Sequence, residues 1–385
     1  MENYRALAGR INYGLFLATV FLLPFPQIVI RYACVAWFIF WVLEGRWLKR
    51  PKPWRENKMV IPILLFGLWY AWELLSGLWA QDTSAWAAQM ERYISFGALV
   101  PVGIWGLNDY YQPKQITKVL VLGALVAVPF YLIALTLCYY YPTLADHFLL
   151  CGEPDWFSFF RENISVFKHR LFLNTVLLFA IVATFRLWWG QWFKIATLAL
   201  PMTFLIGISG SRQSILTAFI LAFVAILTYL PSRQRLRWGG LIGITLLLIG
   251  LTALKFHPRM QGFNIYGESR TILWQQALEN PSDYLWTGLG AGQDRIYLNT
   301  IYDSHNQYLK EFIELGVFGL LLFLCAWIAI PLCAQKRGRL TALFFVVLYG
   351  CNMCTECMFG HFCGVAIWAT ALLFISIQSD TARQE

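Results

Sequence analysis

Apolar stretches long enough to cross a bilayer recur along the whole sequence, and this recurrence limits the folds that are open to the chain. A stretch of about 20 predominantly apolar residues is typical of a transmembrane helix. Only 13% of the 385 residues are charged and 58% are hydrophobic, whereas a soluble domain carries roughly 25% charged residues. The sequence therefore predicts an all-α polytopic membrane protein that forms a single integral membrane domain over residues 1–385.

The apolar stretches divide into twelve predicted spans. The N-terminal one is interpreted as a membrane helix and not as a cleaved signal peptide, because it lacks a small-x-small cleavage site and further spans follow at once. The predicted spans are about 11–25, 28–44, 59–80, 92–106, 117–140, 170–188, 195–209, 213–230, 239–255, 315–333, 341–357 and 361–377.

Basic residues predict the orientation of these spans. The segments "EGRWLKRPKPWRENK", "PSRQRLRW" and "QKRGR" are separated by even numbers of spans, so they lie on one side of the membrane. Short cytoplasmic loops are rich in Lys and Arg, which makes this side cytoplasmic and accounts for the net charge of +9 without a nucleic-acid partner. Two long periplasmic loops then remain, 142–169 and 256–314, and the larger one joins spans nine and ten.

Three predicted helix starts carry polar residues that suggest chemistry. In "SGSRQSIL", Ser209 or Ser211 is a candidate N-cap, and Arg212 falls in the first turn of span eight. The positive end of a helix dipole disfavours a cation there. An anion bound by the free N–H groups and the guanidinium would remove this conflict.

The large loop repeats the arrangement in "GESRTILWQQALENPSD". Ser269 can cap a helix and Arg270 lies in its first turn. "NPSD" is expected to end this helix. The apolar face is expected to consist of Ile272, Leu273, Ala277 and Leu278.

The third helix start is "SHNQYLKEFIELG". Ser304 is the expected cap, and Gly316 permits a bend before the spanning helix. His305 would stand roughly 15 Å along the helix from Leu315, at about 1.5 Å per residue, and face the outer compartment. The apolar stripe at helical spacing consists of Tyr308, Leu309, Phe312 and Ile313, with polar residues between them.

Each of these residues also has an ordinary explanation. A single arginine at a membrane border is usually a snorkelling anchor, and a histidine in a loop is more often a plain polar residue. Three such sites on one face of the membrane favour a pocket for an anion.

At this point the motifs resemble the O-antigen ligase family. "HNQYLKEFIELGVFG" is similar to its pattern of histidine, Asn or Ser, nine residues and Gly-x-x-Gly, with His305, Asn306, Gly316 and Gly319 in register. "SGSR" and Arg270 with Trp274 also look like this superfamily. Further matching positions are Pro281, Gly288, Gly290 and Gly292.

The resemblance implies a GT-C-like inverting glycosyltransferase of the bacterial inner membrane with a periplasmic active site. It would move a glycan from undecaprenyl pyrophosphate to a sugar hydroxyl of lipid A–core, without metal or cofactor. Arg212 and Arg270 would stabilise the leaving pyrophosphate, and His305 would accept the hydroxyl proton. Asn306 and Trp274 are expected to contact substrate together with the two arginines.

O-antigen polymerases and protein O-oligosaccharyltransferases share much of this pattern and stay as alternatives. Protein-glycosylating members usually carry an additional C-terminal region, whereas "SDTARQE" follows directly after the last predicted span. The ligase is therefore the favoured expectation. Because Glu73 and Glu356 lie in or near spans, a polysaccharide or lipid transporter is the rival class.

Two other features carry less weight. "CNMCTECMFGHFC", with Cys351, Cys354, Cys357 and Cys363, has a spacing that metal sites use. It lies at a turn between spans, where cysteine serves as a small apolar residue, so packing is the preferred interpretation and a disulfide is an alternative. Asp294 and Asp303 are expected to be solvated structural residues.

Overall fold

The structure is a computed structural model that describes residues 2–48, 58–141, 152, 155–229, 245, 248, 249, 252, 269–300 and 303–380. All regular elements in these ranges are helices. Their bounds are α1 Glu2–Leu22, α2 Gln27–Glu44, η1 Arg46–Leu48, α3 Val60–Leu75, η2 Ser76–Leu78, α4 Thr83–Trp105, α5 Pro113–Tyr140, α6 Trp156–Phe167, α7 Arg170–Leu187, α8 Trp192–Ile208, α9 Arg212–Tyr229, α11 Ser269–Ala277, η6 Pro281–Asp283, α12 Asp294–Tyr297, α13 Gln307–Cys333, α14 Lys336–Met353, η7 Met358–Gly360 and α15 Phe362–Asp380.

Six of the described helices are long and apolar enough to cross a membrane, which confirms the prediction of a multi-pass, all-helical membrane protein. Three shorter apolar helices accompany them. The ninth predicted span, 239–255, falls almost entirely outside the described residues, so the count of twelve stays a prediction. The six long segments are Gln27–Glu44, Val60–Leu78, Pro113–Tyr140, Arg170–Leu187, Gln307–Cys333 and Phe362–Ser379.

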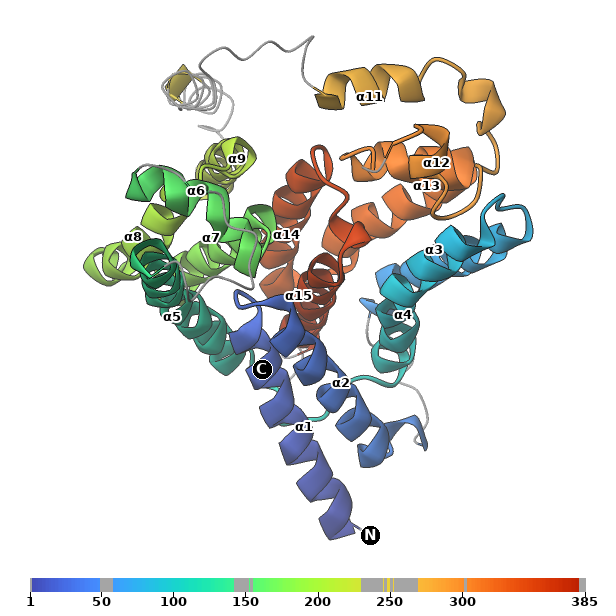
Figure 1. The fold of residues 1–385 in the computed structure, drawn as a ribbon. Helices are drawn as coiled ribbons and strands as arrows, with labels where there is room; N and C mark the ends of the chain where they lie inside the picture. Colours follow the sequence, from blue (N-terminus) through green and yellow to red (C-terminus); the bar gives the residue numbers. More distant parts are fainter. Residues whose placement is uncertain are drawn as a thin grey trace.

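The helices surround α14 and α15, which lie in the middle of the bundle (Figure 1). In that view α3, α4 and α13 lie on one side, α5 to α9 lie on the other, and α1 and α2 pack together as a hairpin. Aromatic side chains fill the centre. The ring of Trp368 on α15 lies 4.5 Å from that of Phe66 on α3 and 4.6 Å from that of Phe96 on α4. Such tilted aromatic pairs contribute packing energy beyond their buried area.

Helix α13 contains a sharp kink at Gly316, whose backbone has φ 66° and ψ −167°. The kink interrupts the helical hydrogen bonds, and the loop before it satisfies the released groups. Leu289 N donates to Ile313 O at 3.0 Å, and Gly290 N donates to Glu314 O at 2.8 Å. In return, Val317 N donates to Leu285 O at 2.8 Å. The predicted bend at Gly316 is therefore confirmed, and residues 285–290 stabilise it.

Two glycines permit this close backbone approach. A Cβ on Gly316 would overlap the carbonyl group of Trp286, and one on Gly288 would overlap that of Glu314. Both residues also have positive φ, a conformation that an L side chain rarely adopts. The "GLGAG" segment is thus a turn shaped to fit the kink.

The same loop is fixed to the connection between α3 and α4. Ala291 N donates to Ser76 Oγ at 2.9 Å. Gln293 exchanges two hydrogen bonds with the backbone of Asp82, at 3.0 and 2.9 Å. The loop therefore joins the kinked helix to α3 and α4.

The polar residues of the segment before the kink, Gln307, Lys310, Glu311 and Glu314, are buried inside the protein. Lys310 is 4% exposed, and its Nζ lies 2.7 Å from Gln89 Oε1 on α4 and 3.1 Å from Glu314 Oε1. Gln89 Nε2 also donates to Glu314 Oε2 at 2.6 Å. Because a buried charge needs a partner, these bonds explain why a polar helix face can pack against α4.

We expect Gly316→Ala to destabilise the protein. This backbone conformation, which is essentially restricted to glycine, costs roughly 1–3 kcal/mol for another residue, and the overlap with Trp286 adds to it. Gly207→Ala on α8 is the matched control, because a Cβ there meets no atom within 4 Å. The apparent melting temperature in detergent should fall only in Gly316→Ala. It is measured from the height of the monodisperse size-exclusion peak after heating. Equal melting temperatures for the two variants would contradict the role given to the kink.

Candidate histidine–carboxylate site

His305 lies in the turn that leads into α13. Its backbone is left-handed, with φ 48°, and its N–H donates to Asp303 Oδ1 at 3.0 Å. The N-cap of α13 is Asn306, whose Oδ1 accepts a hydrogen bond from Leu309 N at 3.1 Å. The prediction that Ser304 is the cap was wrong, because the Asp303 turn precedes the helix and shifts its start by two residues.

Two carboxylates face the ring of His305. Its Nδ1 lies 3.2 Å from Glu356 Oε1 and 3.4 Å from Asp303 Oδ1. The hydrogen bond to Glu356 raises the pKa of His305; burial and the charge of Arg270 oppose this shift, and both carboxylates add to it. The side chain of His305 is 27% exposed, so the ring is only partly buried.

The carboxylates also fix the tautomer of the neutral ring. Burial alone would raise the pKa of Glu356, but the His305 hydrogen bond and the charges of His169 and His305 hold it below its usual value. An ionised carboxylate only accepts hydrogen bonds, so Nδ1 must carry the proton. The lone pair of neutral His305 is therefore on Nε2.

The second oxygen of Glu356 faces a second histidine. Glu356 Oε2 lies 3.9 Å from His169 Nε2, and the His169 ring is stacked against His361 with centroids 6.4 Å apart and planes 10° apart. His169 precedes α7 and closes the predicted outer loop 142–169. Both predicted outer loops thus contribute a residue to this site.

Arg270 belongs to the same site. It is the second residue of α11. Burial lowers the pKa of His169 to about 4 and the charge of Arg270 adds to this shift, whereas at His305 the same charge opposes the rise of the pKa. Trp274, on the same helix, donates from its indole N–H to Ser304 O at 2.7 Å and so joins α11 to the His305 turn. Substrate contact by Trp274 and Asn306 stays a prediction.

The predicted apolar face of α11 is only partly correct. Ala277 and Leu273 pack with Ile313 of α13. Ile272 and Leu278 are instead 51% and 55% exposed. The short helix α11 contacts α13 along a narrow face only, so two of the four apolar residues face away from it.

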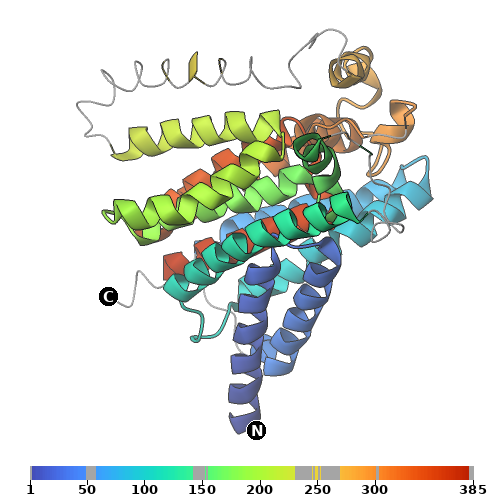
Figure 2. The same ribbon diagram turned by 60° about the vertical axis from the view of Figure 1, so that its left-hand side comes forward.

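Arg212 begins α9, as predicted. Ser211 is the cap, because its Oγ accepts from Ser214 N at 3.3 Å. The next side chain, Gln213, donates to Cys351 O at 2.6 Å. Since Cys351 lies in α14, shortly before Glu356, this bond places the start of α9 beside the segment that leads to Glu356. Arg270 is near enough for its charge to act on His305, and Arg212, at the start of α9, lies at the same end of the bundle (Figure 2).

Asp294 and Asp303 are buried, with 1% and 5% exposure, so the prediction that they are solvated was wrong. Asp294 Oδ2 accepts from Ser304 N at 3.3 Å, and its Oδ1 lies 3.8 Å from Lys310 Nζ. Burial opposes the ionisation of Asp303, but the charges of Lys310, His305 and Arg295 outweigh it and lower the pKa. Both aspartates therefore stabilise the His305 turn through buried hydrogen bonds and ion pairs.

Asp303, His305 and Glu356 have the residue types and spacing that could hold a metal ion, with ligand atoms within 4.8 Å of one another. Their hydrogen bonds also satisfy these atoms mutually. The four cysteines of "CNMCTECMFGHFC" are free thiols. Cys357 and Cys363 are buried, as the packing interpretation predicts, but their sulfur atoms each lie 3.7 Å from a polar group, Ser304 Oγ and Lys168 Nζ respectively.

Glu356, His169 and His361 were not predicted as site residues. Glu356 was noted only as a suspect acid near a span, and the cysteines around it drew attention to metal chemistry. His305 and Glu356 are 51 positions apart. One signal in the sequence could have found these residues. Both predicted outer loops and the turn after α14 lie on the same predicted side of the membrane, and each contains a histidine or an acidic residue.

Fold and site together define a multi-pass membrane protein with a histidine–carboxylate centre and a neighbouring arginine at one end of its helical bundle. Residues 195–324 match the family model described as O-Antigen ligase. The match confirms the resemblance to the O-antigen ligase family over about a third of the chain, which includes Arg212, Arg270 and His305. A comparison with curated proteins found no match.

We expect Glu356→Gln to shift the pH dependence of the activity. The Glu356 carboxylate raises the pKa of His305, so its loss should lower that pKa and move the rising limb of kcat/KM to lower pH. The plateau should also fall, because an amide no longer stabilises the protonated ring and can favour the other tautomer. Cys354→Ser, at an exposed position in the same turn, is the control. An unchanged pH profile in Glu356→Gln would contradict the pairing.

Proposed function

We propose that the protein is an O-antigen ligase that transfers a glycan from undecaprenyl pyrophosphate to a sugar hydroxyl of lipid A–core. The observation that carries the proposal is the His305–Glu356 pair beside Arg270, which contains two of the three predicted catalytic residues. This centre lies at one end of the bundle, where a lipid headgroup and a sugar acceptor can meet.

His305 acts as the general base. Its Nδ1 is held by Glu356, so Nε2 presents a lone pair to the acceptor hydroxyl. The acceptor oxygen bonds to the anomeric carbon while the bond from that carbon to the pyrophosphate breaks, and the hydroxyl proton moves to Nε2. Direct displacement of this kind inverts the anomeric centre. A positioned base contributes about 10²–10⁴-fold to such a rate.

Arg270 and Arg212 stabilise the leaving group. Negative charge develops on the departing pyrophosphate, and a guanidinium binds phosphate oxygens through two parallel hydrogen bonds. Arg212 is accompanied by the first N–H groups of α9, and such helix starts bind anions. Because permanent cations carry this task, the reaction proceeds without a metal ion in our proposal.

The polymerase and the protein O-oligosaccharyltransferase are the alternatives within the superfamily, and they differ in the acceptor. A deletion strain separates them by its lipopolysaccharide ladder. Loss of a ligase leaves bare core with accumulated lipid-linked polymer, whereas loss of a polymerase leaves core with a single repeat. An unchanged ladder with loss of glycosylated protein would identify the third activity.

A transporter is less well supported. Such proteins place their ionic groups at an accessible site near the bilayer midplane. Here the ion pair of Lys310 and Glu314 is buried and hydrogen-bonded to Gln89. The accessible residues of the described site lie instead at one end of the helical bundle.

Substitutions of the arginines and of the histidine should impair different steps, donor binding and turnover respectively. Arg270→Lys keeps the charge but loses the two parallel bonds, so donor binding should weaken and most of the activity should be lost; Arg212→Lys should behave alike. His305→Ala should bind donor normally, with turnover reduced by about 10²–10⁴-fold. Donor binding and single-turnover rates of purified variants measure the two steps separately. Arg10→Lys on α1 is the matched control, and wild-type turnover in His305→Ala would remove the base from the mechanism.

The predicted orientation can be tested with single cysteines in a background without reactive native thiols. Asp283 is exposed in the loop of the site, and Lys114 is exposed at the start of α5. An impermeant thiol reagent added to intact spheroplasts should label Asp283→Cys but not Lys114→Cys. Permeabilised membranes should give labelling of both. The reverse pattern in intact spheroplasts would place the site in the cytoplasm and exclude the proposed acceptor.

A further inference from the structure

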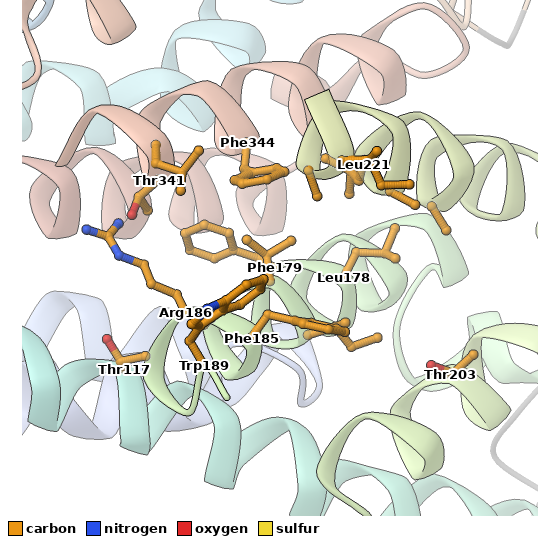
Figure 3. Close-up of a pocket in the computed structure, with 18 of the residues that line it drawn as sticks. Thr117, Leu178, Phe179, Phe185, Arg186, Trp189, Thr203, Leu221, Thr341 and Phe344 are labelled. Carbon is orange, nitrogen blue, oxygen red and sulfur yellow. The ribbon is translucent and has the colours of Figure 1, made fainter. Parts of the chain in front are cut away.

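A second feature of the bundle lies away from the His305 site. A cavity of about 450 Å³ opens among α5, α7, α8, α9, α14 and α15 (Figure 3). Phe179, Leu221 and Phe344 form part of its apolar wall. This volume lies within the roughly 300–1,000 Å³ of ordinary ligand pockets, and the surrounding helices include three of the long apolar ones.

One end of the cavity is polar. Arg186 reaches this end from α7, near Thr341 of α14 (Figure 3). The guanidinium donates from Nη1 to Gln378 Oε1 at 3.0 Å, and Thr341 Oγ1 donates to the same oxygen at 2.8 Å. These bonds hold the guanidinium plane at the wall of the cavity.

The polar end of the cavity carries positive charge. Arg186 is the charged residue among those that line the cavity, and none of the lining residues is acidic. Its guanidinium makes this end complementary to an anion.

The polar end is remote from the His305 site. Helix α7 begins at Arg170, next to His169, and Arg186 lies sixteen residues further along. At about 1.5 Å per residue this is roughly 24 Å, close to the thickness of the hydrocarbon core of a bilayer. Trp189 and Trp192 flank this end, and tryptophan is enriched at the level of the lipid headgroups.

We propose that this cavity binds an anionic glycerophospholipid of the leaflet opposite the His305 site, with one acyl chain in the apolar part and its phosphate on Arg186. The apolar walls account for the chain, and the guanidinium of Arg186 accounts for the anionic headgroup. A lipid-linked pyrophosphate donor that reacts at His305 has its anionic group at the other end of α7, so it does not account for a guanidinium at this end.

The test measures lipids bound to the purified full-length protein by native mass spectrometry. Protein in neutral detergent is titrated with phosphatidylglycerol, phosphatidylethanolamine or undecaprenyl phosphate. We expect one tightly retained phosphatidylglycerol and weaker retention of phosphatidylethanolamine. Arg186→Gln should reduce the preference for phosphatidylglycerol about five-fold, the effect of one cation near an anionic lipid, and Arg186→Lys should largely keep it.

A second variant tests the cavity itself. Ala222→Phe on α9 places a ring where the acyl chain would lie and should reduce the retention of both phospholipids. Leu200→Phe, at a position that is 66% exposed on α8 and does not line the cavity, is the control for folding and for lipid at the outer surface. An unchanged phosphatidylglycerol preference in Arg186→Gln would overturn the proposal. So would retention of undecaprenyl phosphate in place of phosphatidylglycerol, or equal retention in Ala222→Phe and Leu200→Phe.

Discussion

The backbone exchange between residues 285–290 and the kink at Gly316 is the interaction on which the rest of the site depends. A break in a helix inside a bundle leaves N–H and C=O groups that must find partners, since water is excluded. Here Leu289 and Gly290 donate to carbonyls before the kink, and Val317 donates back to Leu285. The part of α13 before the kink can therefore take a direction different from that of the spanning part. Its N-terminus carries His305, so the direction chosen at Gly316 sets where the ring can lie.

Charge balance sets the properties of that ring. His305 lies between two carboxylates, and each of these is held by a further cation or histidine: Arg295 Nη2 lies 3.6 Å from Asp303, and His169 Nε2 lies 3.9 Å from Glu356. Opposite charges nearby favour the charged form of a group and like charges disfavour it. The carboxylates raise the basicity of His305 and Arg270 lowers it. A base at this position is thus tuned by two opposing influences that come from different parts of the chain.

The sequence predicted those features that depend on local chemistry and missed those that depend on distant contacts. The bend at Gly316 and a serine cap for α9 follow from residue types a few positions apart; the bend was predicted correctly, and Ser211 was one of the two cap candidates. The pairs His305–Glu356 and Lys310–Gln89 join positions 51 and 221 apart, and a single sequence does not show such proximity. The burial of Lys310 illustrates the same limit. Its segment has the pattern of an amphipathic helix whether the polar face packs inside the protein or faces solvent. The presence of Gln89, Glu314 and Asp294 next to the ammonium group makes the inward direction favourable.

The position of Arg270 gives the proposed reaction an order of events. Without donor, the guanidinium charge acts on His305 and opposes protonation of the ring. A bound pyrophosphate would neutralise that charge, and the two carboxylates would then act on the ring with less opposition. His305 would therefore become a stronger base when the donor is in place, and a weaker one when the site holds acceptor alone. In the proposed reaction, the arginine that binds the leaving anion thus also controls the basicity of the histidine that takes the proton.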